Sequence, residues 1–140
     1  MLHSKSLKET MILTFGYGNR KDYSTFLSYL EEFNIYCVVD VRSSPRAWSR
    51  KWYGDAIEKL CVLNGIQYTS RTALGNVSGC SRWIPPVQEE ADRTLGEISN
   101  ILKDGSVLLL CAEMDSSRCH RVEVAQKLQD LTSVPVQHLR

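Results

Sequence analysis

The regular alternation of short apolar runs with helix-forming segments limits the fold of this chain more than any other feature. The apolar runs Ile35–Val41 and Val107–Cys111 are typical of strands that are covered on both faces. We expect strands there and at Met11–Phe15, Ile66–Thr69 and Val134–His138. Helices between successive strands imply right-handed crossovers. The sequence therefore predicts an α/β fold, a three-layer sandwich with a mostly parallel five-stranded sheet and helices on both faces.

The segments between the strands have the spacing of apolar residues that indicates helices. Asp22 is the expected cap of the first helix, and the second spans Asp55–Asn64. Pro85 and Pro86 are expected to open the third helix, because a proline at a helix start costs no hydrogen bond. The last helix is expected to follow Asp115 or Ser116 as its N-cap.

The composition is that of an ordinary globular protein. The 140 residues are 43% hydrophobic and 24% charged, and the net charge is only +1, so bulk charge indicates no class of partner. No apolar run approaches the roughly 18 residues that a membrane helix needs, so no membrane partner is expected. We expect a loose leader at residues 1–10 and one domain at residues 11–140. The oligomeric state stays open.

The cysteines bear on the cellular compartment. The chain has five, an odd number, and Cys37 and Cys61 lie inside apolar patterns. Such cysteines do not form a disulfide framework, so a reducing cytoplasm is the expected location.

The basic residues are concentrated in the loops that follow the predicted strands. Ligands of parallel sheets bind outside the carboxyl ends of the strands, where these loops gather. The distribution predicts a positively charged rim that favours a small anionic ligand, such as a phosphate, a nucleotide or a carboxylate. A chance asymmetry of surface charge is the alternative. The basic residues of these loops are Arg20, Lys21, Arg42, Arg46, Arg50, Lys51, Arg71, Arg82, Arg118 and Arg121.

The densest group of chemically reactive side chains lies at residues 111–121. A strand delivers Cys111 to the sheet edge, and a short loop leads to a helix start, where backbone N–H groups bind anions. Cys119 is expected where a helix dipole and arginines lower the pKa of a thiol. His120 could move a proton near neutral pH, and Glu113 could act as a base. The candidate catalytic residues here are Cys111, Glu113, Cys119 and His120, and the candidate anion ligands are Arg118 and Arg121.

Simpler roles are open for the same residues. Cys111 could be a small buried hydrophobe at a strand end, and Cys119 could pack inward. These cysteines, with Glu113 and His120, could also bind a metal ion, but their spacing matches no zinc signature. We therefore expect no metal site and no cofactor.

Two further segments carry polar residues to the same edge. Asp40 ends a buried strand, where a carboxylate needs a partner, and Arg42 or Arg121 could supply it. This pair could be structural or catalytic. Glycines after the first strand let backbone approach a ligand, although Lys21 occupies the third glycine position of the dinucleotide-binding pattern. The candidate ligand-binding residues are Gly16, Tyr17, Gly18, Asn19, Arg20, Arg42 and Ser43, and Asp40 is a candidate catalytic residue.

The segment 43–53 mixes aromatic and basic residues. Trp48, Trp52 and Tyr53 are interleaved with Arg50 and Lys51. This combination suits stacking on the bases of single-stranded nucleic acid. The alternative, which we expect here, is a loop that packs its aromatic side chains on the domain.

Seven short motifs follow one another along the chain, namely Thr14–Arg20, Val39–Pro45, Gly65–Tyr68, Leu74-Gly75, Leu110–Glu113, Cys119–Arg121 and Val136–Leu139. In this order they resemble the domain-of-unknown-function family 488 (DUF488) over almost the whole chain. The pairing of Cys-Ala-Glu with Cys-His-Arg is the most specific part of the resemblance. The resemblance implies an α/β fold and a set of motifs, but no established reaction.

The chain departs from the family pattern at two places. The usual Gly-His-Ser reads Gly16-Tyr17-Gly18, and the usual Leu-Gly-Gly reads Leu74-Gly75-Asn76. If the missing histidine takes part in the chemistry, this chain has altered or lost activity. Tyr17 could keep a hydrogen bond, but it would not titrate near neutral pH.

A looser likeness is to rhodanese-like sulfurtransferases and cysteine phosphatases. These proteins also pair an Asp-x-Arg strand end with a strand, a cysteine, a loop, an arginine and a helix. Between Cys111 and Arg118 this chain has one more residue than the phosphatase pattern, and its loop lacks the glycine.

Three functional hypotheses follow, and whether the chain is an enzyme stays open. The first is an enzyme or enzyme-like domain that binds a small anionic ligand of phosphate or nucleotide type. The second is a rhodanese-like sulfur-transfer or redox enzyme that uses Cys111 or Cys119. The third is a non-catalytic nucleic-acid-binding module.

Overall fold

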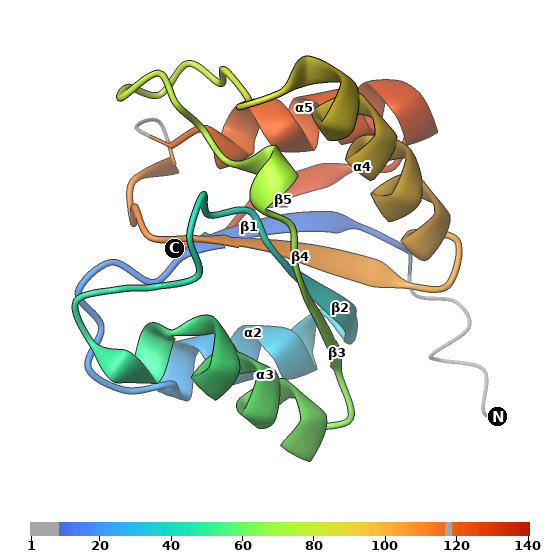
Figure 1. Cartoon of the computed structure of the whole chain (residues 1–140). Coiled ribbons are helices and arrows are strands. Elements are labelled where there is room, and N and C mark those ends of the chain that lie inside the picture. Colours follow the sequence, from blue (N-terminus) through green and yellow to red (C-terminus); the bar gives the residue numbers. More distant parts are fainter. Residues whose placement is uncertain (1–8, 117–118) are drawn as a thin grey trace, which may run out of the picture.

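The structure, a computed structural model, describes residues 9–116 and 119–140 and places a parallel sheet between two pairs of helices (Figure 1). The five strands lie in the order β3-β2-β4-β1-β5 and all pairs are parallel. The predicted α/β three-layer fold is therefore confirmed. Of the predicted leader, positions 1–8 lie outside the described residues. The strands are β1 (Ile12–Gly16), β2 (Ile35–Asp40), β3 (Gln67–Ser70), β4 (Ser106–Cys111) and β5 (Val136–His138).

Side chains from the two faces of the sheet form two separate cores. In β4, Leu108 and Leu110 contribute to one core, and Val107 and Leu109 contribute to the other. This double burial explains why β4 carries no alternating polar residues. The first core lies under α2 (Ser24–Glu32) and α3 (Gly54–Leu63), and the second under α4 (Gln88–Ile101) and α5 (Arg121–Thr132).

The helix starts differ from the sequence prediction at both α2 and α5. The N-cap of α2 is Tyr23 and not the predicted Asp22, although Asp22 binds the first helical residue, Ser24. The Asp22 carboxylate accepts hydrogen bonds from the backbone N–H and the hydroxyl of Ser24, at 3.0 and 2.6 Å. The predicted N-cap of the last helix at Asp115 or Ser116 is wrong, because α5 begins at Arg121. The buried Arg121 side chain donates to carbonyl groups of the preceding loop, and this contact fixes where the helix begins. Cys119 therefore precedes the helix instead of lying in its first turn.

The connections leave the carboxyl edge of the sheet in opposite directions. Strands β1 and β2 lead to helices on one face, whereas β4, which lies between them, leads to α5 on the other face (Figure 1). Diverging loops of this kind leave a crevice where ligands of parallel sheets usually bind. In the described part of the chain, no helix is long and apolar enough to cross a membrane.

Candidate functional site

An ion pair is buried where β2 reaches the carboxyl edge. Arg42 binds Asp40 through two side-chain hydrogen bonds, Nε to Oδ1 at 2.8 Å and Nη2 to Oδ2 at 2.6 Å. Asp40 is fully buried and Arg42 is only 5% exposed. The Tyr68 hydroxyl on β3 donates to the same carboxylate at 2.6 Å. Of the two predicted partners for Asp40, the structure thus selects Arg42.

The remaining donors of Arg42 are engaged by the protein itself. Its Nη1 atom donates to the Tyr17 hydroxyl at 3.1 Å and to the carbonyl groups of Trp52 and Arg46, at 2.8 and 3.2 Å. Burial lowers the pKa of Arg42, but the hydrogen bonds and charge of Asp40 raise it by more. Arg42 thus stays charged and joins β2 to the two loops beside it.

Tyr17 forms part of the same buried network. Its ring stacks on Trp52, with centroids 4.8 Å apart, and it is 4% exposed. Burial raises the pKa of Tyr17, so its hydroxyl keeps its proton at neutral pH. Position 17 thus supplies a neutral hydroxyl bonded to Arg42.

The glycines after β1 make room for the chain itself. A Cβ atom on Gly16 would lie 1.7 Å from the Glu113 carbonyl oxygen, and one on Gly18 would lie 2.5 Å from the Met114 side chain. Gly18 also has a positive φ of 59°. Both glycines are therefore needed where the loop after β4 lies against the loop after β1.

Arg121 holds the loop after β4 from beneath. It is fully buried and donates to the carbonyl oxygens of Glu113 and Met114, the latter at 3.2 Å. Its Nε atom is buried and has no hydrogen-bond partner among the described residues. Arg118, the predicted second arginine of this group, lies outside the described residues.

An open cavity of about 1190 Å³ lies above the buried network. Three cationic side chains line it, Arg20, Lys21 and Arg46, together with the carboxylate of Glu113. Among the described residues the ion pairs are Asp40–Arg42 and Arg71–Glu97, so the three cations take part in neither. The other lining residues are Tyr17, Gly18, Asn19, Ala47, Trp48, Ser49, Trp52, Ala112 and Met114.

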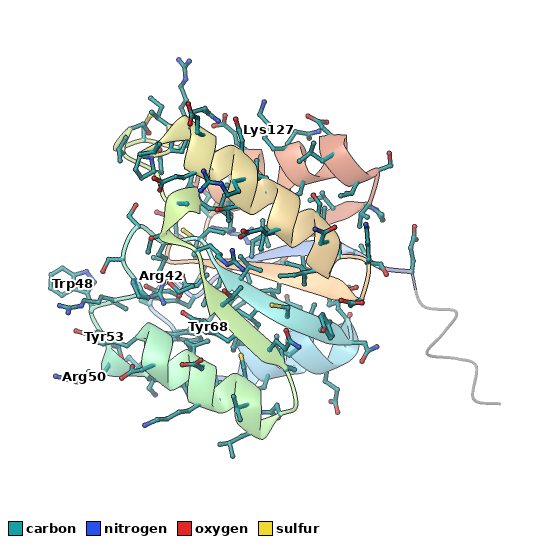
Figure 2. All side chains as sticks on the ribbon, turned by 45° about the vertical axis from the view of Figure 1, so that its right-hand side comes forward. Arg42, Trp48, Arg50, Tyr53, Tyr68 and Lys127 are labelled. Carbon is teal, nitrogen blue, oxygen red and sulfur yellow. The ribbon has the colours of Figure 1, made fainter. Side chains whose placement is uncertain are left out.

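The aromatic residues of segment 43–53 divide between the core and the rim. Trp52 is buried and donates through Nε1 to the Arg20 carbonyl at 2.9 Å, as expected for a packed loop. Trp48, in contrast, is fully exposed and extends away from the domain (Figure 2). The expectation of packed aromatic side chains is therefore wrong for Trp48, which has no buried surface to pack against.

The two cysteines of the sequence constellation meet on the opposite side of β4. Cys111 at the end of β4 and Cys119 before α5 have Sγ atoms 3.0 Å apart. The Nδ1 atom of His120 lies 3.9 Å from the Cys119 sulfur. All three residues are buried, and their potential ligand atoms lie within 4.8 Å of one another.

The surroundings of His120 fix its tautomer. Its Nε2 atom lies 3.0 Å from the carbonyl oxygens of both Val41 and Leu74. Carbonyl oxygens only accept hydrogen bonds, so Nε2 carries a proton. In the neutral ring, Nδ1 then presents its lone pair on the side of Cys119.

The surroundings of the buried cysteines shift the pKa values of their thiols in different directions. The hydrogen bond with Cys111, followed by those with His120 and the Arg121 backbone, lowers the pKa of Cys119 to about 4 against the effect of burial. The same contact raises the pKa of Cys111. Burial is the main cause that raises the pKa of Cys37 to about 11, against the charge of Arg71, and that of Cys61 to about 12, where the charges of Cys37 and Glu58 add to it. The contact thus favours a thiolate on Cys119 over one on Cys111, whereas burial keeps the two core cysteines protonated.

Ser43 and the Leu74-Gly75-Asn76 segment contact each other at the end of β2. The Ser43 hydroxyl accepts a hydrogen bond from the Asn76 backbone N–H at 3.1 Å. A Cβ atom on Gly75 would lie 2.4 Å from the Ser43 oxygen, so glycine is required there. Ser43 therefore joins two loops.

Sequence reasoning did not place several residues of these sites. Tyr68 reaches Asp40 only because β3 lies beside β2, and strand order cannot be read from the chain. The sequence places Lys21, Arg46 and Trp48 in loops, but their common cavity depends on how three loops converge. Their clustering after strand ends was the available signal.

Fold and site together define a three-layer α/β protein with a cationic cavity and a buried Cys-Cys-His cluster at the carboxyl edge of a parallel sheet. The family model described as domain of unknown function DUF488 matches residues 22–128, and the chain belongs to this family. The segment with Tyr17 precedes the matched range, whereas Asp40, Cys111 and Cys119 lie within it. Comparisons with curated proteins and with solved structures gave no match.

Proposed function

We propose that this chain binds a small anionic ligand of phosphate or nucleotide type in the cavity at the carboxyl ends of β1, β2 and β4. The observation that carries the proposal is the lining of the cavity, which includes the cations Arg20, Lys21 and Arg46 and a single carboxylate, that of Glu113. Neither ion pair of the described residues uses these cations. Lys21 and Arg46 are exposed, whereas Arg20 is half-buried with its guanidinium 5.0 Å from the centre of the Phe15 ring. This excess of positive charge favours an anionic ligand.

The shape and the aromatic rim favour a ligand that carries a flat ring as well as an anionic group. A volume of about 1190 Å³ is ample for a mononucleotide, since small-molecule sites usually enclose roughly 300–1,000 Å³. The exposed indole of Trp48 at the rim offers a surface for stacking. In this proposal the cations hold the anionic group, and Glu113 accepts a hydrogen bond from a ligand hydroxyl.

Two arginines of the original expectation are left out of the proposed ligand set. The guanidinium of Arg42 is engaged by Asp40, Tyr17 and backbone carbonyl groups. That of Arg121 is fully buried beneath the loop it holds. Both residues support the cavity by fixing its loops.

The test is a thermal-shift panel of matched compounds on the whole chain. It compares nucleoside monophosphates and sugar phosphates with the corresponding nucleosides and sugars. We expect a phosphorylated member to raise the melting temperature and its unphosphorylated partner to have little effect, because binding to the folded state stabilises it. A panel in which no phosphorylated compound raises the melting temperature would contradict the proposal.

Single-stranded nucleic acid is the competing ligand. Arg50 stacks on Tyr53, at 5.6 Å from the ring centroid, and Figure 2 shows both Arg50 and Trp48 on the outer side of the loop. An oligonucleotide that binds more tightly than any mononucleotide, with an affinity that falls steeply with salt, would replace the small ligand in this account.

Thiol-disulfide exchange at Cys111 and Cys119 is a second candidate function, favoured by the 3.0 Å between their sulfurs. The Cys119 thiolate would attack one sulfur of a substrate disulfide and release the other as a thiolate. Cys111, after losing its proton, would attack the mixed disulfide, releasing the second substrate thiol and leaving a Cys111–Cys119 disulfide. With a small aromatic disulfide, Cys111→Ser should accumulate the mixed disulfide on Cys119. Reaction at the exposed Cys80 only would rule this function out.

A further inference from the structure

Three potential metal-binding atoms converge on the side of the sheet that faces α4 and α5. They are the sulfurs of Cys111 and Cys119 and the Nδ1 atom of His120. All lie within 4.8 Å of one another, and the three residues are 5% to 7% exposed. The cluster is separate from the cavity, whose lining includes none of these residues.

His120 has the outer contacts typical of a metal-binding histidine. Metal-bound imidazoles almost always donate their other N–H group to a carboxylate, a carbonyl or a water. Here Nε2 lies 3.0 Å from two carbonyl oxygens, those of Val41 and Leu74. These contacts come from two separate loops, and they orient the unprotonated nitrogen toward the sulfurs before any ion binds.

The spacing of the ligand atoms is close to that of a tetrahedral site. Zinc–sulfur bonds of about 2.3 Å and zinc–nitrogen bonds of about 2.0–2.1 Å place neighbouring ligand atoms roughly 3.5–3.8 Å apart. The Cys119 sulfur and the His120 Nδ1 atom, at 3.9 Å, are within about 0.1 Å of this range. The sulfurs, at 3.0 Å, need to separate by less than about 1 Å.

We infer that Cys111, Cys119 and His120 form a binding site for a thiophilic metal ion of the zinc class. Two thiolates and a neutral imidazole are ligands that select Zn²⁺ or Cu⁺ over magnesium or calcium. Three protein ligands leave one coordination position for water or an added ligand. The inference is independent of the anion proposal, because the two sites share no residue.

The spacing rules of zinc motifs could not find this site. Seven residues separate the two cysteines, and the histidine follows the second one directly. The ligand atoms meet because β4 ends beside the residues that precede α5 and because the loops after β2 and β3 hold the imidazole.

The test is a titration of the whole chain, reduced with a phosphine and freed of metal, with Co²⁺ followed by Zn²⁺. We expect one Co²⁺ per chain with thiolate-to-metal charge-transfer absorption, displacement by Zn²⁺, and a higher melting temperature with Zn²⁺. Cys111→Ser and Cys119→Ser should each weaken Zn²⁺ binding by more than the roughly 10- to 100-fold that loss of an outer contact costs. Cys80→Ser, which removes an exposed thiol, should bind as the unaltered chain does.

The absorption of the unaltered chain decides the outcome even if a cysteine variant fails to fold. Stoichiometric Co²⁺ without thiolate absorption would overturn the inference. So would thiolate absorption that persists in Cys111→Ser, or a Cys111–Cys119 disulfide whose reduction gives a chain unable to bind either ion.

Discussion

The cavity and the cysteine cluster lie at the same edge of the sheet, on opposite sides of the end of β4, and they are built in contrasting ways. The cavity has exposed cations in Lys21 and Arg46, and it exposes Trp48 completely. The cluster is buried, and its histidine is fixed by two backbone carbonyl groups. The exposed cationic side chains can exchange bound water for a ligand. The buried sulfur and nitrogen atoms of the cluster leave room only for something as small as a metal ion. The same sheet edge thus carries the two sites that we propose for an anion and for a metal ion.

The two ion pairs of the described residues also differ in burial. The Asp40–Arg42 pair is almost completely buried and shares its groups with Tyr17, Tyr68 and backbone carbonyls. The Arg71–Glu97 pair lies on the surface, with side chains 28% and 49% exposed. Only the first can determine the shape of the edge, because exposed pairs contribute roughly 0–1 kcal/mol.

The largest expected effect is in the reactivity of Cys119. With its pKa lowered to about 4, Cys119 stays a thiolate between pH 8 and pH 5. Its rate of alkylation by iodoacetamide, followed by mass spectrometry of the cysteine peptides, should therefore stay nearly constant over this range. Free glutathione should slow by roughly 1000-fold over the same range, since an ordinary thiol has a pKa of about 8.5. A parallel fall for Cys119 would refute the assignment of the thiolate.

The next largest effect is expected from Asp40→Asn. This variant leaves the buried guanidinium of Arg42 without a counter-charge, and breaking a buried pair costs about 3–5 kcal/mol. Urea denaturation should show this loss in the free energy of unfolding. Glu97→Gln, the matched change in the exposed pair, should cost less than about 1 kcal/mol. Equal losses of unfolding free energy in the two variants would show that the buried pair stabilises the fold no more than the exposed pair does.

A smaller loss is expected when Gly16 is replaced by alanine. The added methyl group would clash with the Glu113 carbonyl oxygen and push the loop after β4 away, at a cost of about 1–3 kcal/mol. Gly96 in α4 is the control, because an added methyl group meets no atom within 4 Å there. Gly96→Ala should stabilise the chain by about 0.5–1 kcal/mol in thermal or urea unfolding. A neutral Gly16→Ala would mean that the two loops are not held together as described.

The smallest effect is expected from Tyr17→Phe. The variant keeps the stack on Trp52 but removes the hydroxyl that accepts a hydrogen bond from Arg42, at a cost of about 0.5–1.5 kcal/mol in urea unfolding. Tyr36→Phe, which removes an exposed hydroxyl bonded to Gln67, should stay within about 0.5 kcal/mol of the unaltered chain. If Tyr17→Phe changed nothing, the buried network would end at Arg42.

Much of the fold could be predicted because burial leaves a direct mark on the sequence. The run Val107–Cys111 is apolar since both of its faces are covered, and β4 was found almost to the residue. The start of α5 could not be predicted in this way. The local capping residues Asp115 and Ser116 favour an early start, whereas the helix begins at Arg121. The bonds from Arg121 to the loop after β4 decide the matter, and they exist only in the folded chain.

The sequence predicts which residues lie at the candidate site, but it does not predict which of them contact each other. Asp40 and Arg42 are two residues apart on one strand end, so their pairing could be foreseen. The meeting of Cys111, Cys119 and His120 also needs the carbonyl groups of Val41 and Leu74, which the chain order does not bring together. Gly16 is a residue whose predicted role differs from its place in the structure. The sequence predicts that it lets a ligand approach, but in the structure it makes room for the backbone carbonyl of Glu113.

The most direct test of the central claim is calorimetric titration of the cavity with the nucleoside monophosphate that most raises the melting temperature. The unaltered chain should bind one equivalent, and the double variant Arg20→Ala/Arg46→Ala should bind at least about 10-fold more weakly, since each tenfold change is about 1.4 kcal/mol. Lys103 is an exposed cation in the turn that leads into the amino end of β4, so Lys103→Ala should leave the affinity unchanged. Equal weakening by Lys103→Ala, or undiminished binding by the double variant, would contradict the account.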